Sequence, residues 1–397
     1  MARPKIAMHI RNRPDDAVCV FSTLDTISGE VAITSEHDIR YSDVKISFEG
    51  RTTVTIRNDF GGQTKADETF LYLQGQVDDN LLLENGTSRI FPFTFVVPKA
   101  LSPFSCQHSR RDTLVPYAHT ELPPSLGEWP SVSFSSRDDP TIDTQCPQTV
   151  RIRYHVVASF RLQDPQCKST ISARREVFIL PTVVSERPPP PFTPSFDLCA
   201  FKSEIHPFSA QKDFKHGVFR TRLGRLSIRA MPPDPISMCL HSSLQARTLL
   251  TLHMQFESYH DCSIPPPVLN RITASLRAIT FFSTSPWTEI PTDPVAVRKQ
   301  TQSGVYVKTV QLGMAELPSV VWEECPGDQG EQSGKRVYEA VVQTPVLLPG
   351  GRALVPTFHS CLVARCYELL VRVSYRGWKG FLPGRVAVDV PVTVVVG

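Results

Sequence analysis

Three residues of types that bind metal ions lie close together in the sequence: Cys106, His108 and His119. Thiolate sulfur and imidazole nitrogen are donor atoms that zinc takes in proteins. A structural zinc site needs four ligands, normally in two closely spaced pairs, and the sequence has no C-x-x-C motif. The sequence therefore predicts no metal centre, and we expect these three residues to be unrelated members of a loop.

Sequence motifs of catalytic and nucleotide-binding sites are also missing. The sequence contains no G-x-S-x-G, G-x-x-x-x-G-K-[ST], H-E-x-x-H or G-x-G-x-x-G motif. We therefore expect a protein that is not an enzyme and that has no cofactor. A β-sandwich enzyme or carbohydrate-binding protein is kept as an alternative, because catalytic groups can also be assembled from distant parts of a sequence.

Basic residues are concentrated between positions 212 and 229. On a strand, Arg220 and Arg222 share one face, and Arg225 and Arg229 share a face as well. Either pair is suited to contact phosphate or the anionic headgroups of a membrane surface. The alternative is that these charges protect the edge of a sheet against aggregation. A net charge of +3 is too small to predict a nucleic-acid partner.

Arg365 lies in an otherwise apolar pattern. It shares the odd-numbered face of its predicted strand with Tyr367, Leu369 and Val371, which should be the core face. A buried arginine needs a polar partner, and a carboxylate from another domain would make Arg365 an interdomain polar contact. The alternative is that the residue lies near the strand end and extends its guanidinium into water.

The elements that must position these residues are strands. Apolar and polar residues alternate along most of the sequence, as in Val44–Glu49, which is typical of half-buried strands. Gly50, directly after that run, is expected to form a hairpin turn. The same alternation, or a short β-branched and aromatic run, predicts further strands at 30–34, 52–56, 69–73, 91–97, 151–162, 176–180, 196–205, 248–256, 272–282, 305–312, 337–348, 362–375 and 386–396.

Prolines, which are 35 of the 397 residues, punctuate these strands and exclude a mostly helical fold. The densest cluster, in residues 185–195, should adopt an extended polyproline II conformation and act as a semi-rigid linker. We therefore predict an all-β fold with two tandem β-sandwich domains, at residues 1–184 and 196–397, joined by this proline-rich hinge. Within the first domain, residues 98–149 are expected to form a long irregular insertion at the surface.

Several features bear on the location of the protein in the cell. The N-terminal residues include no apolar stretch typical of a signal peptide, and no run of about 18 apolar residues occurs anywhere. The ten cysteines have no repeated spacing, which favours reduced thiols over a disulfide framework. The sequence therefore predicts a cytoplasmic protein.

Three groups of motifs, in order along the chain, resemble the arrestin superfamily and in particular its α-arrestin-like branch. The first is a G-E-V strand followed by a strand that ends in F-x-G, and the second combines F-x-F-x-x-P, L-P-P-S and Y-x-V-x-A. The third, at 348–358 and 365–373, is similar to the C-terminal arrestin domain. These motifs lie at 28–34, 44–52, 91–98, 122–127, 153–158, 348–358 and 365–373. The resemblance implies an arrestin fold of two immunoglobulin-like sandwiches.

The resemblance also implies a function. Proteins of this family are adaptors that bind membrane-protein cargo, often its cytoplasmic tails, for endocytic trafficking or ubiquitylation. Many α-arrestins recruit a ubiquitin ligase through a P-P-x-Y motif, which this sequence lacks, so any recruitment is expected to be indirect or absent. The alternative adaptor is a retromer-like subunit of a sorting complex. Either function implies a cytoplasmic protein that is peripheral at the plasma membrane or at endosomes.

Overall fold

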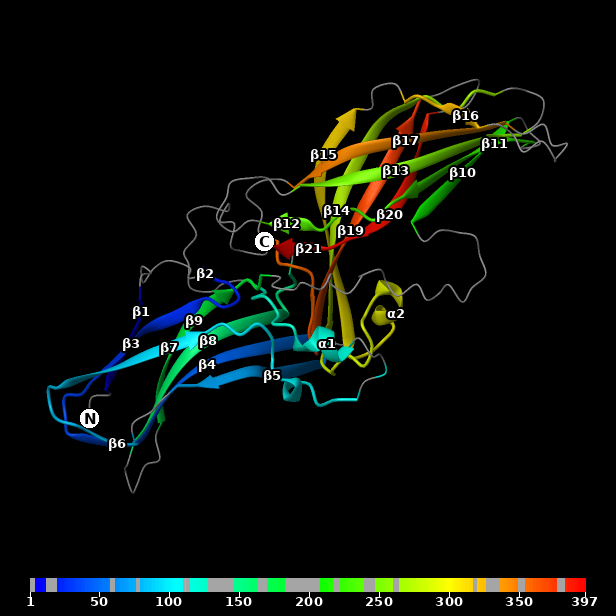
Figure 1. The fold of residues 1–397 in the computed structure, drawn as a ribbon. Coiled ribbons are helices and arrows are strands. Elements are labelled where there is room, and N and C mark those ends of the chain that lie inside the picture. Colours follow the sequence, from blue (N-terminus) through cyan, green and yellow to red (C-terminus); the bar gives the residue numbers. More distant parts are fainter. Residues whose placement is uncertain are drawn as a thin grey trace.

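The computed structural model shows a fold made almost entirely of strands, arranged in two β-rich lobes (Figure 1). The all-β class that the sequence predicted is thus confirmed. Among the described residues, no helix is long and apolar enough to cross a lipid bilayer. The structure describes residues 4–11, 20–57, 61–75, 79–109, 111, 115–127, 146–162, 170–182, 208–216, 221–238, 247–259, 264–316, 320–325, 336–348, 354–376 and 383–397.

The N-terminal lobe contains a three-stranded and a six-stranded sheet. The antiparallel three-stranded sheet has the order β1 (Lys5–Ile10), β3 (Thr26–Thr34), β7 (Ser88–Val96). The six-stranded sheet has the order β2 (Val20–Phe21), β9 (Thr170–Ile179), β8 (Val150–Leu162), β4 (Ile39–Arg57), β5 (Gln63–Gln74), and β6 (Asp79–Leu83) pairs with β4.

The C-terminal lobe contains two five-stranded sheets and a small parallel pair. One sheet has the order β10 (Ser209–His216), β11 (Thr221–Ala230), β13 (Arg247–Ser258), β17 (Arg336–Leu347), β16 (Glu323–Cys325). The other has the order β15 (Ser303–Glu316), β14 (Leu269–Ser283), β19 (Val363–Tyr375), β18 (Phe358–His359), and β20 (Gly384–Val392) pairs with β19. The parallel pair is β12 (Ile236–Met238) with β21 (Val394–Val396).

The alternation in the sequence places one apolar face of each strand in a core. In β4, Val44, Ile46 and Phe48 are buried, as the sequence predicted. The ring of Phe48 stacks on Tyr154 of β8 at 5.8 Å and packs against Phe95 of β7 at 6.0 Å, so the two N-terminal sheets meet through aromatic contacts. Such pairs add to the free energy gained by burying apolar area. We call the buried cluster between these sheets the first core, and the cluster between the C-terminal sheets the second core.

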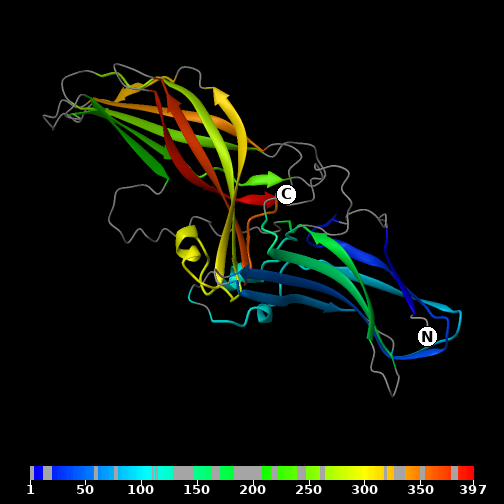
Figure 2. The same ribbon diagram turned by 180° about the vertical axis from the view of Figure 1, so that it is seen from behind.

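Two long strands connect the lobes. β14 and β19 pair along most of their length and extend from the second core down to the N-terminal sheets (Figures 1 and 2). Leu369 and Val371 of β19 are buried in the second core, whereas Val363 of the same strand and Leu362 just before it are buried in the first core. The two cores therefore share a pair of strands. The predicted hinge at 185–195 and the predicted strand at 196–205 lie outside the described residues.

Gly50 does not form the hairpin turn that the sequence suggested. β4 continues through it, and Gly50 pairs with Leu71 of β5 and with Tyr154 of β8. A Cβ atom at this position would lie 2.5 Å from Phe70 Cε2 and 2.9 Å from Tyr154 Cε1. The glycine is there because two aromatic rings approach the backbone, and a close approach and a turn favour the same residue type.

The segment 98–149 is not simply an irregular insertion at the surface. Its described part contains a short 3₁₀ helix, η1 (Pro103–Ser105), and a helix, α1 (Val115–Thr120). Leu101, Cys106 and Leu122 are buried in the first core. The hydroxyl of Tyr154 also donates a 2.5 Å hydrogen bond to the carbonyl of Pro123, so the segment is held by both apolar and polar contacts.

Replacing Gly50 tests why a glycine occupies this position. We expect Gly50→Ala to lower the free energy of unfolding by about 1–3 kcal/mol, because the new methyl group must displace the two rings. Urea unfolding measures this change. Gly75→Ala is the control: its Cβ would lie 3.3 Å from the nearest atom, the carbonyl oxygen of Ile46, so a smaller loss is expected. Equal losses would contradict the explanation.

Candidate functional site

One face of the sheet β10–β11–β13–β17–β16 is turned away from the second core. Along β13 the even-numbered residues, among them Leu250, Leu252 and Phe256, are buried in that core. The odd-numbered residues therefore lie on the opposite face, as strand geometry requires. This outward face includes Leu249 and His253, both exposed.

This outward face is concave. A hollow of about 700 Å³ lies over β11, β13 and β17. Its lining combines cations, two carboxylates and apolar side chains. We call it the hollowed sheet face; it includes Arg225, Arg229, Met231, His253, Glu257, Glu339 and Val341.

Large apolar side chains are exposed on the hollowed sheet face. Val341 is 59% exposed and Met231 is 49% exposed. Leu249, which is 49% exposed, lies directly opposite Pro345 on the same outward side and extends the apolar area beyond the hollow. A group of exposed apolar side chains surrounded by polar ones is typical of a protein-binding surface.

Three different kinds of side chain lie in one row across neighbouring strands of the sheet. Arg229 of β11 lies opposite His253 of β13, which in turn lies opposite Val341 of β17. Residues directly opposite on neighbouring strands have Cβ atoms about 5 Å apart. A cation, an imidazole and an apolar side chain are thus placed side by side and exposed.

The predicted basic residues take different positions on β10 and β11. The pairing of these strands shifts so that Phe214 faces Gly224 whereas Lys215 faces Arg222. This irregularity lets both Arg222 and Arg225 reach Asp213, at N···O distances of 3.5 and 2.8 Å. Two of the four predicted anion contacts are therefore partly neutralised. Of the other two, Arg229 lies on the hollowed sheet face and Arg220 lies outside the described residues.

The neighbouring arginines lower the pKa of the Asp213 carboxyl. The hydrogen bond from Arg225 lowers the pKa of the Asp213 carboxyl, and the positive charges of Arg225, Arg222 and Lys215 lower it further. The carboxylate is therefore stabilised in its ionised form by the fold.

Arg365 is fully buried, at 0% exposure, so its guanidinium does not extend into water. Its Nε donates to the Thr280 hydroxyl at 2.9 Å, and Nη1 lies 3.4 Å from the Tyr367 hydroxyl. The Tyr367 hydroxyl in turn donates to the Val355 carbonyl at 2.7 Å. On β19, Arg365 lies between Val363 of the first core and Tyr367 of the second. The interdomain role of Arg365 stays a prediction. The structure places the residue between the two cores.

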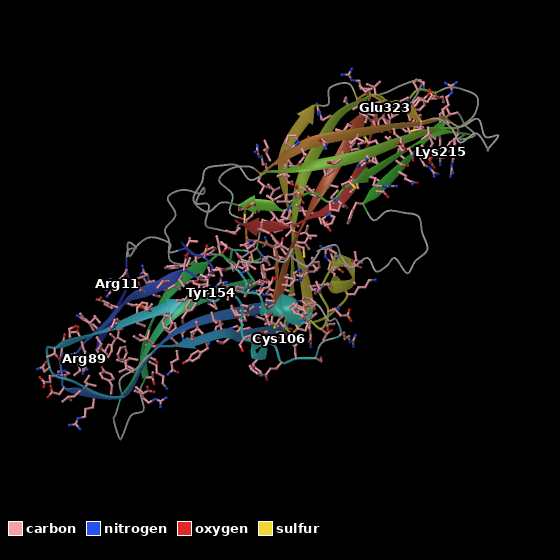
Figure 3. The ribbon with its side chains drawn as sticks, in the orientation of Figure 1. Arg11, Arg89, Cys106, Tyr154, Lys215 and Glu323 are labelled. Atoms are coloured by element: carbon pink, nitrogen blue, oxygen red, sulfur yellow. The ribbon has the colours of Figure 1, made fainter. Side chains whose placement is uncertain are left out.

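The structure brings together the three metal-binding residue types of the segment 98–149 and adds a fourth. Cys106 follows η1, His108 lies two residues later and His119 lies in α1. Cys361, in the turn between β18 and β19, comes to the same place, and one ligand atom from each residue lies within 4.8 Å of all the others. Figure 3 shows Cys106 close to α1, where the ends of β14 and β19 reach the N-terminal lobe.

The sequence reasoning missed Cys361 because nothing in its local pattern pairs it with the segment 98–149. Cys106 and His119 are each 1% exposed, and burial strongly raises the pKa of the Cys361 thiol. His359, at the end of β18, is buried nearby, and this burial lowers its pKa to about 3. These groups lie in a part of the interior where uncompensated charge is costly.

Comparison with known proteins assigns this chain to no family. No protein-family model matches it, and no curated protein sequence matches it.

The Asp213 ion pairs generate a pH prediction. A carboxyl whose pKa is lowered by folding adds stability above the unfolded pKa of about 3.9, and this stability is lost as the pH falls through the folded value. We therefore expect Asp213→Asn to lower the melting temperature at pH 6. Because these ion pairs are partly exposed, the loss in the free energy of unfolding should be under about 1 kcal/mol. The difference in melting temperature between Asp213→Asn and the original protein should be smaller at pH 3, where the Asp213 carboxyl becomes protonated. A difference that is unchanged between the two pH values would contradict the ion-pair assignment.

The burial of Arg365 generates a stability prediction. Arg365→Ala leaves a cavity beside Thr280 and Tyr367 and should lower the free energy of unfolding by about 2–5 kcal/mol, as for other large buried side chains. Arg372→Ala, on the same strand but half-buried, is the matched control and should cost under about 1 kcal/mol. Chemical denaturation followed by tryptophan fluorescence measures both. An unchanged stability of Arg365→Ala would refute a structural role for this residue.

Proposed function

We propose that this protein is a non-enzymatic adaptor and that the hollowed sheet face is where it binds a segment of a partner protein. The observation that carries this proposal is the concave face itself, on which the apolar side chains of Val341 and Met231 are exposed in the same hollow as Arg229. Exposed apolar side chains are otherwise a liability, and a surface that combines them with a cation in a hollow suits protein recognition.

The chemistry of this surface favours a particular type of segment. Arg229 lies exposed on the hollowed sheet face and, within the part of the chain that the structure describes, forms no ion pair with a carboxylate, so it is suited to an acidic side chain. Val341, in the same cross-strand row, is suited to an apolar side chain of the partner. A partner segment that carries an acidic and an apolar residue about two strand spacings apart, which is about 10 Å, would contact both.

The resemblance to the arrestin superfamily suggests which proteins carry such a segment. The partner is then a cytoplasmic tail or loop of a membrane protein, bound for endocytic trafficking or ubiquitylation. Because the sequence contains no P-P-x-Y motif, a ubiquitin ligase would join through another protein. The protein would be located in the cytoplasm, at the plasma membrane or at endosomes.

Proximity labelling in the native cell tests the proposal. We expect Val341→Asp to reduce the labelling of membrane proteins at least tenfold, because a carboxylate placed in the apolar contact opposes binding by a few kcal/mol. Ile90→Asp is the matched control, since Ile90 is an equally exposed apolar residue, 57% exposed, on β7 of the other lobe. Equal labelling by Val341→Asp and the original protein would refute this binding site.

The identity of the labelled proteins and a vesicle experiment separate the alternatives. Membrane transporters together with a ubiquitin ligase would support the adaptor function, whereas coat subunits alone would favour a retromer-like sorting subunit. Sedimentation with anionic phospholipid vesicles tests the membrane surface as a partner. If Arg229→Glu abolishes vesicle binding while Val341→Asp leaves the labelling unchanged, the surface contacts lipid headgroups and not a protein segment.

A further inference from the structure

We propose that Cys106, His108, His119 and Cys361 bind a structural Zn²⁺ ion that ties the segment after β7 to the turn between β18 and β19. The four residues provide two sulfur and two nitrogen donors, which is one of the ligand sets of structural zinc sites. This inference goes beyond the proposed function, because it concerns how the two lobes are joined and not what the hollowed sheet face binds.

The distances among the donor atoms of Cys106, His108 and His119 are close to the edges of a tetrahedron around zinc. With Zn–S bonds of about 2.3 Å and Zn–N bonds of about 2.0–2.1 Å, the edges of such a tetrahedron are about 3.3 Å for N···N, 3.5 Å for S···N and 3.8 Å for S···S. His108 Nε2 lies 3.3 Å from His119 Nδ1, and Cys106 Sγ lies 3.5 Å from His119 Nδ1. Cys106 Sγ lies 3.0 Å from His108 Nε2, which is somewhat shorter than the expected edge. Only small movements of these three side chains are needed for zinc geometry, and Cys361 Sγ lies within 4.8 Å of all three donor atoms.

The hydrogen bond of His108 Nδ1 favours one tautomer of its neutral ring. Its Nδ1 lies 3.0 Å from the carbonyl oxygen of Ser109, which can only accept a hydrogen bond. Nδ1 therefore carries the proton in the neutral ring, and the lone pair of Nε2 is directed toward Cys106 and His119. In zinc sites, the non-ligating nitrogen of a histidine commonly donates to a carbonyl in this way.

Hydrogen bonds outside the cluster hold two of the segments that carry the donors. The Ser102 hydroxyl accepts from Phe104 N at the start of η1, just before Cys106. In the turn that carries Cys361, Ser360 N donates to the Val363 carbonyl at 2.8 Å, and Trp287 N donates to the Cys361 carbonyl at 2.8 Å. The donors thus come from a helix, a segment after a 3₁₀ helix and a tight turn, and the last two are ordered by contacts outside the cluster.

Zinc also explains the convergence of all four donors better than hydrogen bonds do. A hydrogen bond joins one donor to one acceptor, so a network needs only successive neighbours to be close. Here each of the four atoms lies within 4.8 Å of the other three. Binding of zinc would deprotonate the two thiols and neutralise the charge of the ion inside the fold.

The experiment measures zinc in the purified full-length protein. We expect about one zinc per chain by elemental analysis after a desalting step, the stoichiometry of one four-ligand site. Cobalt(II) added to the chelator-treated protein should give the visible absorption bands of tetrahedral cobalt bound to thiolate. Both signals should fall to background in Cys361→Ser and in His108→Ala, the second being the least buried member and thus the variant expected to keep its fold.

Cys325→Ser is the control variant, since Cys325 lies on β16 at the far side of the C-terminal lobe and is not part of the cluster. It should retain both the zinc and the cobalt spectrum. Absence of zinc together with absence of tetrahedral cobalt bands in the folded original protein would overturn the proposal. So would full retention of zinc by Cys361→Ser and His108→Ala, or a disulfide between Cys106 and Cys361 in the protein purified without reductant and with metal present.

Discussion

The pairing of β14 with β19 is the constraint on which the rest of the structure depends. Every second side chain of a strand lies on the same face of its sheet. A strand that is long enough can therefore place side chains of one face in two different cores. β19 contributes Val363 to the first core and Leu369 to the second, and β14 contributes Phe282 and Leu276 in the same way. A shift of one residue in this register would remove apolar contacts from both cores at once.

Between the two cores, the same face becomes polar. Arg365 and Thr280 pair across β19 and β14 and replace apolar packing by a hydrogen bond. Burying a guanidinium there costs free energy, which hydrogen bonds to Thr280 and Tyr367 and the contact of the charge with the Tyr367 ring, 5.8 Å from its centroid, partly offset. The polar boundary favours one arrangement of the strands over others, because a shifted register would leave the guanidinium without these partners. The cluster of Cys106, His108, His119 and Cys361 lies at the end of the same strand pair. This cluster and the hydrogen bonds of Arg365 are therefore both found where the lobes meet.

The strands were predictable from the sequence and the long-range contacts were not. The alternation in Val44–Glu49 identified a buried face correctly, since burial of one face is a local property of a strand. Gly50 was misread because a close approach of aromatic rings and a turn both favour glycine. Arg365 was placed on the core face by its parity, but its partner Thr280 is distant in the sequence. Cys361 could not be joined to Cys106 for the same reason, as only the folded strand pair brings them together.

The composition of the first core has a further consequence. Val355, Phe358, Leu362 and Val363 belong to it, although they lie in the last tenth or so of the chain, after most of the strands of the second core. An N-terminal half produced by itself would therefore lack part of its hydrophobic core. A C-terminal half produced by itself would expose these apolar residues to water. Most strands of the N-terminal lobe precede those of the C-terminal lobe in the sequence, yet neither half can replace its counterpart in another protein independently. Recombination between related genes at the proline-rich segment would preserve the fold only if both parents had complementary surfaces at this joint.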